Sequence, residues 1–340
     1  MLTNEHIGIN HLFILGQERN SFSMQTKIPK IFEQINKEDI YNVLDKKYSI
    51  LGSTWVSHQI EWFNGNYACF KDHDKFLIII YLTKKTLDFY LSNFTKLTYW
   101  EFFSNENIEI GEFNISEISN ELYIPKESAR RKIIELENEG VIRKIGKKII
   151  IDRSCFNYSK PIDSIKRVST FLSTLSTMAY EEKILPKKLT SSELELIIKN
   201  NFSNIWNFYY ELQIPMMINY KKIFKDFDSF HIFGICVVGQ HFDAKKLSTQ
   251  QIDRDDFMKS FFTHAKPQGV NAMSISEITG IPRATVIRKL QKLVKQGNLT
   301  IDKKKHYRLK GTFLKSIKPI QKDNLFRLAN FSAKIYNLAL

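Results

Sequence analysis

The chain has 340 residues, more than one typical domain needs, and 43% of them are hydrophobic, which is enough to form buried cores. Lys and Arg number 50 against 36 Asp and Glu, and the net charge of +14 favours a polyanionic partner such as nucleic acid. Cys69, Cys155 and Cys236 are widely spaced and form no CxxC pair, which argues against a disulfide framework and against a zinc site.

An N-terminal extension is predicted over residues 1–29. It has no basic region before its apolar patch and no small-residue cleavage signal, so we expect no signal peptide. The longest apolar runs, residues 76–82 and 232–238, are far shorter than the roughly 20 residues that a membrane helix requires. We therefore expect a cytoplasmic protein without a membrane partner.

A first unit is predicted over residues 30–183. It begins with an amphipathic segment, residues 31–45, and continues with an aromatic-rich segment and an apolar one that ends near Leu91. The apolar segment is too long for a single strand, so we expect a helix that is buried on all sides. Asp72 and Asp74 stand just before it, where acidic residues stabilise a helix N-terminus, so we favour capping over catalysis or metal binding.

Residues 113–152 predict two short helices followed by a hairpin. Pro125 precedes the second helix, Gly140 ends it, and the basic segment 143–148 lies at the hairpin tip. A last helix is expected over residues 164–178. The polar residues expected on the outer side of the second helix and at the tip are Lys126, Ser128, Arg130, Arg131, Lys132, Lys147 and Lys148.

A second unit, residues 184–340, repeats the first. The segment 70–76, FKDHDKF, recurs 154 positions later as residues 224–230, FKDFDSF. Further matches recur 157 or 158 positions later, and offsets so nearly constant indicate a tandem duplication. The matched residues are Ile118-Ser119 with Ile275-Ser276, Ile124-Pro125 with Ile281-Pro282, Arg131-Lys132 with Arg288-Lys289, Gly140 with Gly297, and Lys160-Pro161-Ile162 with Lys318-Pro319-Ile320.

Residues 271–311 hold the clearest motif: a short helix, a turn at Gly280, a second helix and a closing pair of strands. Pro282 suits the first helical position, because its missing N–H would be unpaired there, and Gly297 ends the helix. One side of the second helix is apolar at helical spacing. The residues on this side are Val286, Leu290, Leu293 and Val294.

The other side of this helix is polar and basic, and so is the tip at residues 302–305 between the two strands. A helix in a DNA major groove needs donors toward base edges and phosphates, and a basic tip suits a phosphate backbone. The residues expected to contact DNA here are Arg283, Thr285, Arg288, Lys289, Lys292, Lys303, Lys304 and Lys305.

This stretch resembles the winged helix-turn-helix domain of MarR-like and related bacterial transcription regulators, in which I-x-x-x-T-G-I-x-R-x-T-V-x-R-x-L-x-x-L-x-x-x-G is a familiar run. The resemblance is strong over about a tenth of the chain. The residues that carry it are Ile275, Thr279, Gly280, Ile281, Arg283, Thr285, Val286, Arg288, Leu290, Leu293 and Gly297. It implies that the second helix is a recognition helix and that the hairpin is the wing.

The resemblance and the duplication together define the expected fold. In MarR-like dimers, the terminal helices of the two subunits form a shared core that sets the spacing of the DNA-binding heads. We therefore expect a mainly α protein with small β-wings, a single-chain pseudo-dimer whose halves are related by an approximate two-fold axis. Oligomerisation would not be required. The last helices, residues 164–178 and 324–340, are expected to cross to the other half.

The predicted function is sequence-specific binding of double-stranded DNA, with transcriptional regulation through two non-identical winged helices. No phosphate-binding loop, dinucleotide turn, metalloprotease helix or nucleophile elbow is found, so we expect neither an enzyme nor a cofactor or metal. Two alternatives remain. One is a plasmid- or phage-type replication initiator, and the other is a protein-interaction scaffold whose winged helices do not touch DNA.

A small-molecule effector is left open. The four tryptophans, Trp55, Trp62, Trp100 and Trp206, could line a pocket between the units, as in such regulators. Large aromatic side chains are ordinary core material, and we favour that interpretation.

The two heads differ in charge. The first recognition helix contains Glu127 and Glu135, whereas the second has no acidic residue from Pro282 to Gly297. Glu127 could read a cytosine amino group, but we favour its role as an acid in the first helical turn. We therefore expect the second head to dominate affinity and the target to contain two dissimilar half-sites.

Overall fold

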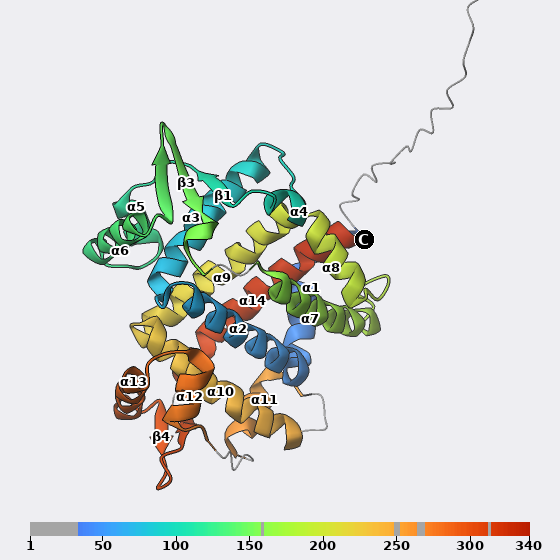
Figure 1. The fold of residues 1–340 in the computed structure, drawn as a ribbon. Coiled ribbons are helices and arrows are strands. Elements are labelled where there is room, and N and C mark those ends of the chain that lie inside the picture. The colour runs from blue at the N-terminus through green and yellow to red at the C-terminus, as the bar shows by residue number, and fades with distance from the viewer. Residues whose placement is uncertain (1–32, 158–159, 248–251, 264–268, 312–313) are drawn as a thin grey trace, which may run out of the picture. The chain divides into compact units, whose positions relative to one another are not determined.

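The computed structural model describes residues 33–157, 160–247, 252–263, 269–311 and 314–340. Over these ranges the fold is mainly helical with two small antiparallel sheets (Figure 1), which confirms the mainly α class with small β elements. The predicted extension, residues 1–29, lies outside the described residues. None of the described helices is long and apolar enough to cross a membrane.

Three helices open the first half: α1 (Lys37–Lys46), α2 (Tyr48–Phe70) and α3 (His73–Ser92). The chain turns between α2 and α3 at Lys71, whose φ is 53°. Asp72 then caps α3, because its carboxylate accepts the backbone N–H groups of Asp74 at 2.9 Å and Lys75 at 3.1 Å. The predictions of a cap and of a long apolar helix are confirmed.

The remainder of the first half contains the first sheet. Its central strand pairs antiparallel with both of the others, so the hairpin is extended by a strand at residues 107–110 that was not predicted. The elements are α4 (Tyr99–Phe102), β1 (Asn107–Ile110), α5 (Ile115–Glu121), α6 (Lys126–Asn138), β2 (Ile142–Ile145), β3 (Lys148–Asp152), a short 3-10 helix (Arg153–Cys155) and α7 (Ile162–Glu181).

The second half has a closely similar order of elements. They are α8 (Ser191–Asn200), α9 (Phe202–Phe224), α10 (Phe227–Leu247), α11 (Arg254–Thr263), α12 (Ala272–Thr279), α13 (Arg283–Lys295), β4 (Leu299–Ile301), β5 (Tyr307–Leu309) and α14 (Leu314–Ala339). α10 continues through Gly234, where a Cβ atom would clash with Cδ1 of Ile60. Glycine at this position lets α10 lie close against α2.

The long helices of the two halves pack against each other reciprocally. α2 contacts α10 while α9 contacts α3, and α1 contacts α14 while α8 contacts α7. Figure 1 shows α2, α9 and α14 crossing the middle, with α5 and α6 above and α12 and α13 below on the left-hand side. Residues 35–340 form one compact unit with a continuous hydrophobic core, so both helix-turn-helix segments rest on the same support.

Candidate nucleic-acid interface

Two segments carry the predicted DNA-binding residues, and we call residues 107–152 the first head and residues 270–309 the second head. In each head a serine closes the turn between the two short helices. Ser119 Oγ donates to the carbonyl of Ile124, and Ser276 Oγ donates to the carbonyl of Ile281, both at 2.7 Å. The turns are therefore built in the same way.

The second helix of each head begins just after a proline. Pro125 and Pro282 both have φ of −53°, with ψ of 136° and 133°, so they are extended N-cap residues. Pro282 was predicted as the first helical residue, and this is wrong by one position. Gly280 ends α12 with φ of 71°, as the predicted turn requires, whereas the first head has Tyr123 with φ of 52° at the corresponding place.

Both α6 and α13, the helices that the sequence predicts to be recognition helices, bury one apolar face. In α13 the fully buried residues are Val286, Leu290 and Leu293, and in α6 Ala129, Ile133 and Leu136 are buried. The apolar face predicted for α13 is confirmed. The opposite face of each helix is open to solvent, so this face is available to a partner.

The tip of the second wing projects three exposed lysines, Lys303, Lys304 and Lys305. Asp302 shapes this tip, because its carboxylate accepts the backbone N–H groups of Lys304 and His306, both at 2.9 Å. These bonds, with the one from His306 as the largest influence, lower the pKa of Asp302. The Asp302 carboxylate is thus hydrogen-bonded within the turn, while the three lysine side chains are exposed to solvent.

The outer side of α13 carries two arginines that are open to solvent. Arg283 and Arg288 are exposed, and within the described ranges no carboxylate lies within ion-pair distance of either guanidinium. Thr285 is half-buried beside them. Two exposed lysines that sequence reasoning missed, Lys295 and Lys310, extend this basic surface. Lys295 follows Arg288 by two helical turns, and this spacing was a signal that could have identified it.

Two further residues of α13 that were predicted to contact DNA, Lys289 and Lys292, form ion pairs with Asp226. The Lys289 side chain is only 13% exposed, and its Nζ lies 2.7 Å from Asp226 Oδ1. Lys292 Nζ lies 3.1 Å from Asp226 Oδ2. Burial would raise the pKa of Asp226, but the hydrogen bonds from Lys289 and from the backbone of Ser229 outweigh burial and lower it. Lys289 and Lys292 therefore hold α13 to the start of α10. Lys289 has little surface left for the predicted DNA contact, whereas the Lys292 side chain is 41% exposed.

Lys132 occupies the same place in the first head. Its side chain is 15% exposed and pairs with Asp72, the cap of α3, and with Glu135 at 3.3 Å. Lys75 of α3 reaches back to Glu139 at 2.6 Å. Lys132 therefore holds α6 to α3, and its side chain has little surface left for the predicted DNA contact.

Most of the other predicted cations in the first head also have carboxylate partners. Arg130 pairs with Glu127 at 2.9 Å, Arg131 lies 3.7 Å from Glu135, and Lys148 pairs with Glu109 at 2.9 Å. Lys126 and Lys147 are exposed, and Ser128 is half-buried. The positive charge of the first head is thus largely balanced within the head itself.

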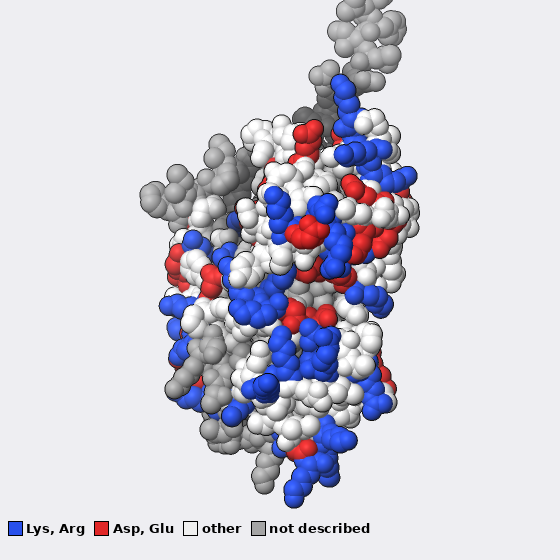
Figure 2. Space-filling model, turned by 90° about the vertical axis from the view of Figure 1, so that its left-hand side faces the viewer, with Lys and Arg blue, Asp and Glu red and all other residues white. Residues whose placement is uncertain are grey.

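Figure 2 shows this difference on the side of the molecule where α6 and α13 lie. Blue atoms gather with few red ones in the lower part of the view, where the second head lies. In the upper part, blue and red atoms alternate. On this face of the molecule, the basic surface is therefore concentrated on the second head.

The described ranges contain no group of three or more His, Cys, Asp or Glu side chains that could hold a metal ion. Cys69, Cys155 and Cys236 form no disulfide bond with one another. Comparisons of this chain with protein families, with curated proteins and with solved structures find no match. The geometry and charge of the two heads are therefore the features that bear on function.

Proposed function

We propose that the chain is an internally duplicated winged helix-turn-helix protein, a single-chain pseudo-dimer of residues 30–183 and 184–340 that binds double-stranded DNA. Equal element lengths support the duplication: α2 and α9 both have 23 residues, and α6 and α13 both have 13. The matched turns and the reciprocal helix contacts support it further.

DNA binding is supported above all by those exposed cations of the second head for which the described ranges hold no carboxylate partner. Arg283 and Arg288 lie on the open side of a helix, and residues 303–305 lie at the tip of the adjacent hairpin. An arginine can donate two hydrogen bonds to a guanine edge in the major groove, and lysines beside the groove neutralise phosphates. The two kinds of contact together suit a helix in the groove with a wing on the backbone.

The role that we propose for this binding is site-specific regulation of transcription. Because most of the predicted cations of the first head pair with carboxylates of the same head, the second head supplies most of the affinity for DNA. The preferred target then has two dissimilar half-sites, which selection of bound duplexes from a random library would reveal. A perfectly palindromic target would contradict unequal heads.

Fluorescence anisotropy with a labelled random duplex of about 30 base pairs, at low salt, tests DNA binding directly. The wild-type protein should bind the duplex. The variant Lys303→Ala with Lys304→Ala and Lys305→Ala should bind on the order of 100-fold more weakly. A matched variant with Lys166, Lys187 and Lys188 replaced by Ala removes the same charge from exposed sites outside the heads, and it should bind nearly as the wild type does. Absence of duplex binding at low salt would reject the proposal.

A further inference from the structure

In each half, two long helices meet at a tight junction that begins with the same three residues, Phe-Lys-Asp. Lys71 lies between α2 and α3, and Lys225 lies between α9 and α10. An ion pair between Lys221 of α9 and Asp74 of α3, at 2.7 Å, joins the two junctions directly. The two junctions therefore pack against each other.

Neighbouring residues of the first junction reach different heads. Asp72 forms an ion pair with Lys132 of the first head. The preceding residue, Lys71, extends toward the second head, where its Nζ atom lies 3.6 Å from the position that a Cβ atom on Gly280 would occupy. Because two adjacent residues contact the two heads, this junction lies between the heads.

The second junction has the reciprocal arrangement. Asp226 pairs with Lys289 of the second head at 2.7 Å, while the Nζ atom of Lys222 lies 5.4 Å from the centroid of the Tyr123 ring in the first head. Figure 1 shows the end of α9 and the start of α10 on the left-hand side, between α5 and α6 above and α12 and α13 below. A duplex that lies across both heads therefore passes the two junctions.

Three exposed lysines of the junctions have no carboxylate within ion-pair distance in the described ranges. These junction lysines are Lys71, Lys222 and Lys225. Three of the junction acids, Asp72, Asp74 and Asp226, pair with lysines of the fold. The fourth, Asp228, is half-buried, and burial raises the pKa of its carboxyl. The junctions therefore present excess positive charge, and Figure 2 shows basic side chains in the middle of this face as well.

Two of the junction lysines have a backbone conformation that favours glycine. Lys71 has φ of 53° and Lys225 has φ of 69°, and each caps the C-terminal end of a 23-residue helix. Helices that end in this left-handed conformation usually have glycine there, because a side chain is strained. Strained positions of this kind cluster at functional sites. Lysine at both positions, despite the strain, indicates that its side chain has a use.

We propose that the junction lysines form a third DNA contact, on the minor groove of the spacer between the two half-sites. When two recognition helices enter successive major grooves about 34 Å apart, the minor groove faces the protein midway between them. A·T-rich spacers narrow this groove and strengthen its negative potential, which attracts lysine side chains. The contact therefore selects the spacer by its shape. This inference rests on the proposed function of DNA binding.

Anisotropy titrations with a labelled random duplex of about 30 base pairs, at several salt concentrations, test this contact. Lys71→Gly with Lys225→Gly should bind about tenfold more weakly than the wild type at low salt. The slope of log affinity against log salt should fall by about two in this double variant and by about one in each single variant. Lys183→Gly is the matched control for the single variants, because Lys183 is exposed, has φ of 60° and lies just after α7, outside both heads. Its slope should equal that of the wild type.

Selection of bound duplexes from a random library should give A·T-rich spacers with the wild type but not with the double variant. Thermal melts check the fold, and the glycine variants should melt no lower than the wild type, because glycine relieves the strain. A lower melting temperature would contradict this account of the junctions. No duplex binding by the wild type would reject the proposed function itself. Duplex binding by the wild type with an unchanged salt slope in the double variant would overturn this inference alone.

Discussion

The two heads share a backbone design and differ in the partners of their exposed side chains. In both, a serine closes the turn, and a lysine ties the recognition helix to the capping aspartate of a long helix, through Lys132 with Asp72 and Lys289 with Asp226. Outside these ties, Arg130 and Arg131 have glutamate partners, whereas Arg283 and Arg288 have none in the described ranges.

The residues that hold each head in place differ from the residues that a head exposes to a partner. Buried residues, caps and ties fix the position of the recognition helix, and they are matched in the two halves. Exposed charge can change without loss of the fold, because surface substitutions away from such features alter stability little. The functional difference should therefore lie in affinity, while the stability of the two heads stays coupled through the common core.

The largest effect should be a joint loss of both heads in acid. Burial lowers the pKa values of His58 and His73 to about 3 and lowers the pKa of His231 well below its ordinary value. The unfolded chain binds protons at these residues near pH 6.5 while the folded chain does not, so stability falls as the pH falls from about 6.5 toward 3. Three such residues give a loss of roughly 4 kcal/mol per pH unit.

Urea unfolding followed by tryptophan fluorescence and by circular dichroism at several pH values measures this loss. His73 corresponds to Phe227 in the other half, and His73→Phe should reduce the pH slope by about a third. Both signals should report a single transition. An unchanged slope in His73→Phe would show that this residue does not limit acid stability, and two separate transitions would contradict a shared core.

The second expected effect concerns the arginines of the recognition helices. Arg283→Ala with Arg288→Ala should weaken duplex binding by roughly 100-fold, since a good contact to a base contributes about 1–3 kcal/mol. Arg130→Ala with Arg131→Ala removes the same charge from cations that already have carboxylate partners, and it should weaken binding only a few-fold. Anisotropy titrations compare the duplex affinities of the two variants, and equal losses of affinity would contradict the proposed difference between the heads.

The ion pairs Lys132–Asp72 and Lys289–Asp226 should contribute equally to the free energy of unfolding. Asp72→Asn and Asp226→Asn each remove an ion pair and weaken a helix cap, so each should reduce the free energy of unfolding by about 1–2 kcal/mol. Because the pKa of Asp226 is lowered in the fold, its contribution is present above the ordinary carboxyl pKa and disappears as the pH falls below about 4. Denaturant unfolding of both variants at pH 7 and at pH 3.5 tests this, and a cost in only one variant would show that the ties are not equivalent.

The smallest effect concerns the turns. Gly280→Ala should reduce stability by about 1 kcal/mol, because a side chain is strained at a φ of 71°. Tyr123→Gly should change stability by less than about 0.5 kcal/mol, since relief of strain is offset by backbone entropy and by loss of the Lys222 contact with the ring. Thermal unfolding measures both. A larger loss for Tyr123→Gly than for Gly280→Ala would contradict this account of the turns.

Local features could be predicted from the sequence, because neighbouring residues determine them. Asp72 was identified as a cap and Gly280 as a turn from their immediate surroundings. The partner of Lys292 could not be found in this way, since Asp226 lies 66 positions away and meets it only after α10 and α13 have packed. For the same reason the four-residue strand β1 was missed, as its partner β3 follows after two helices.

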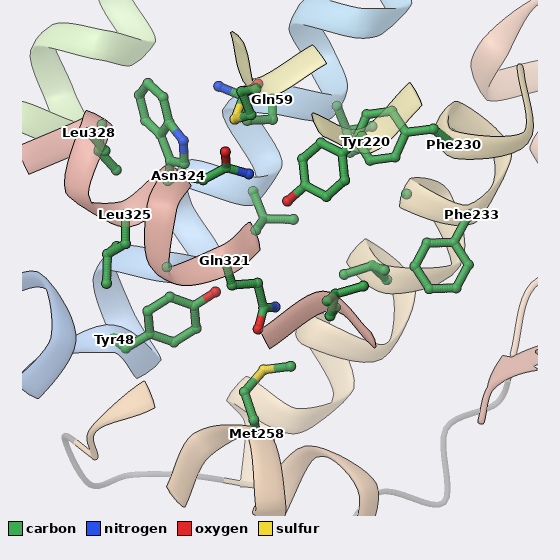
Figure 3. A pocket seen from close by; sticks show the side chains of 18 of the residues that line it. Tyr48, Gln59, Tyr220, Phe230, Phe233, Met258, Gln321, Asn324, Leu325 and Leu328 are labelled. Carbon is green, nitrogen blue, oxygen red and sulfur yellow. The ribbon is translucent and has the colours of Figure 1, made fainter. Parts of the chain in front are cut away.

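A cavity of about 130 Å³ between helices of the two halves (Figure 3) could not be predicted from the sequence. Of the four tryptophans, which the sequence offers as pocket residues, only Trp55 lines this cavity, and all four lie in the described part of the chain. Gln59 also lines it, and an amide becomes informative only when its burial is known.

The salt dependence of duplex affinity tests the central claim most directly. The logarithm of the binding constant should fall linearly with the logarithm of salt concentration, by about 0.9 for each neutralised phosphate. Replacing Lys303, Lys304 and Lys305 by Ala should reduce the slope by nearly three, while replacing Lys144, Lys147 and Lys148 in the first wing should reduce it by less than about one. Equal reductions for the two wings, or an affinity that does not change with salt, would contradict a DNA-binding protein whose second head dominates.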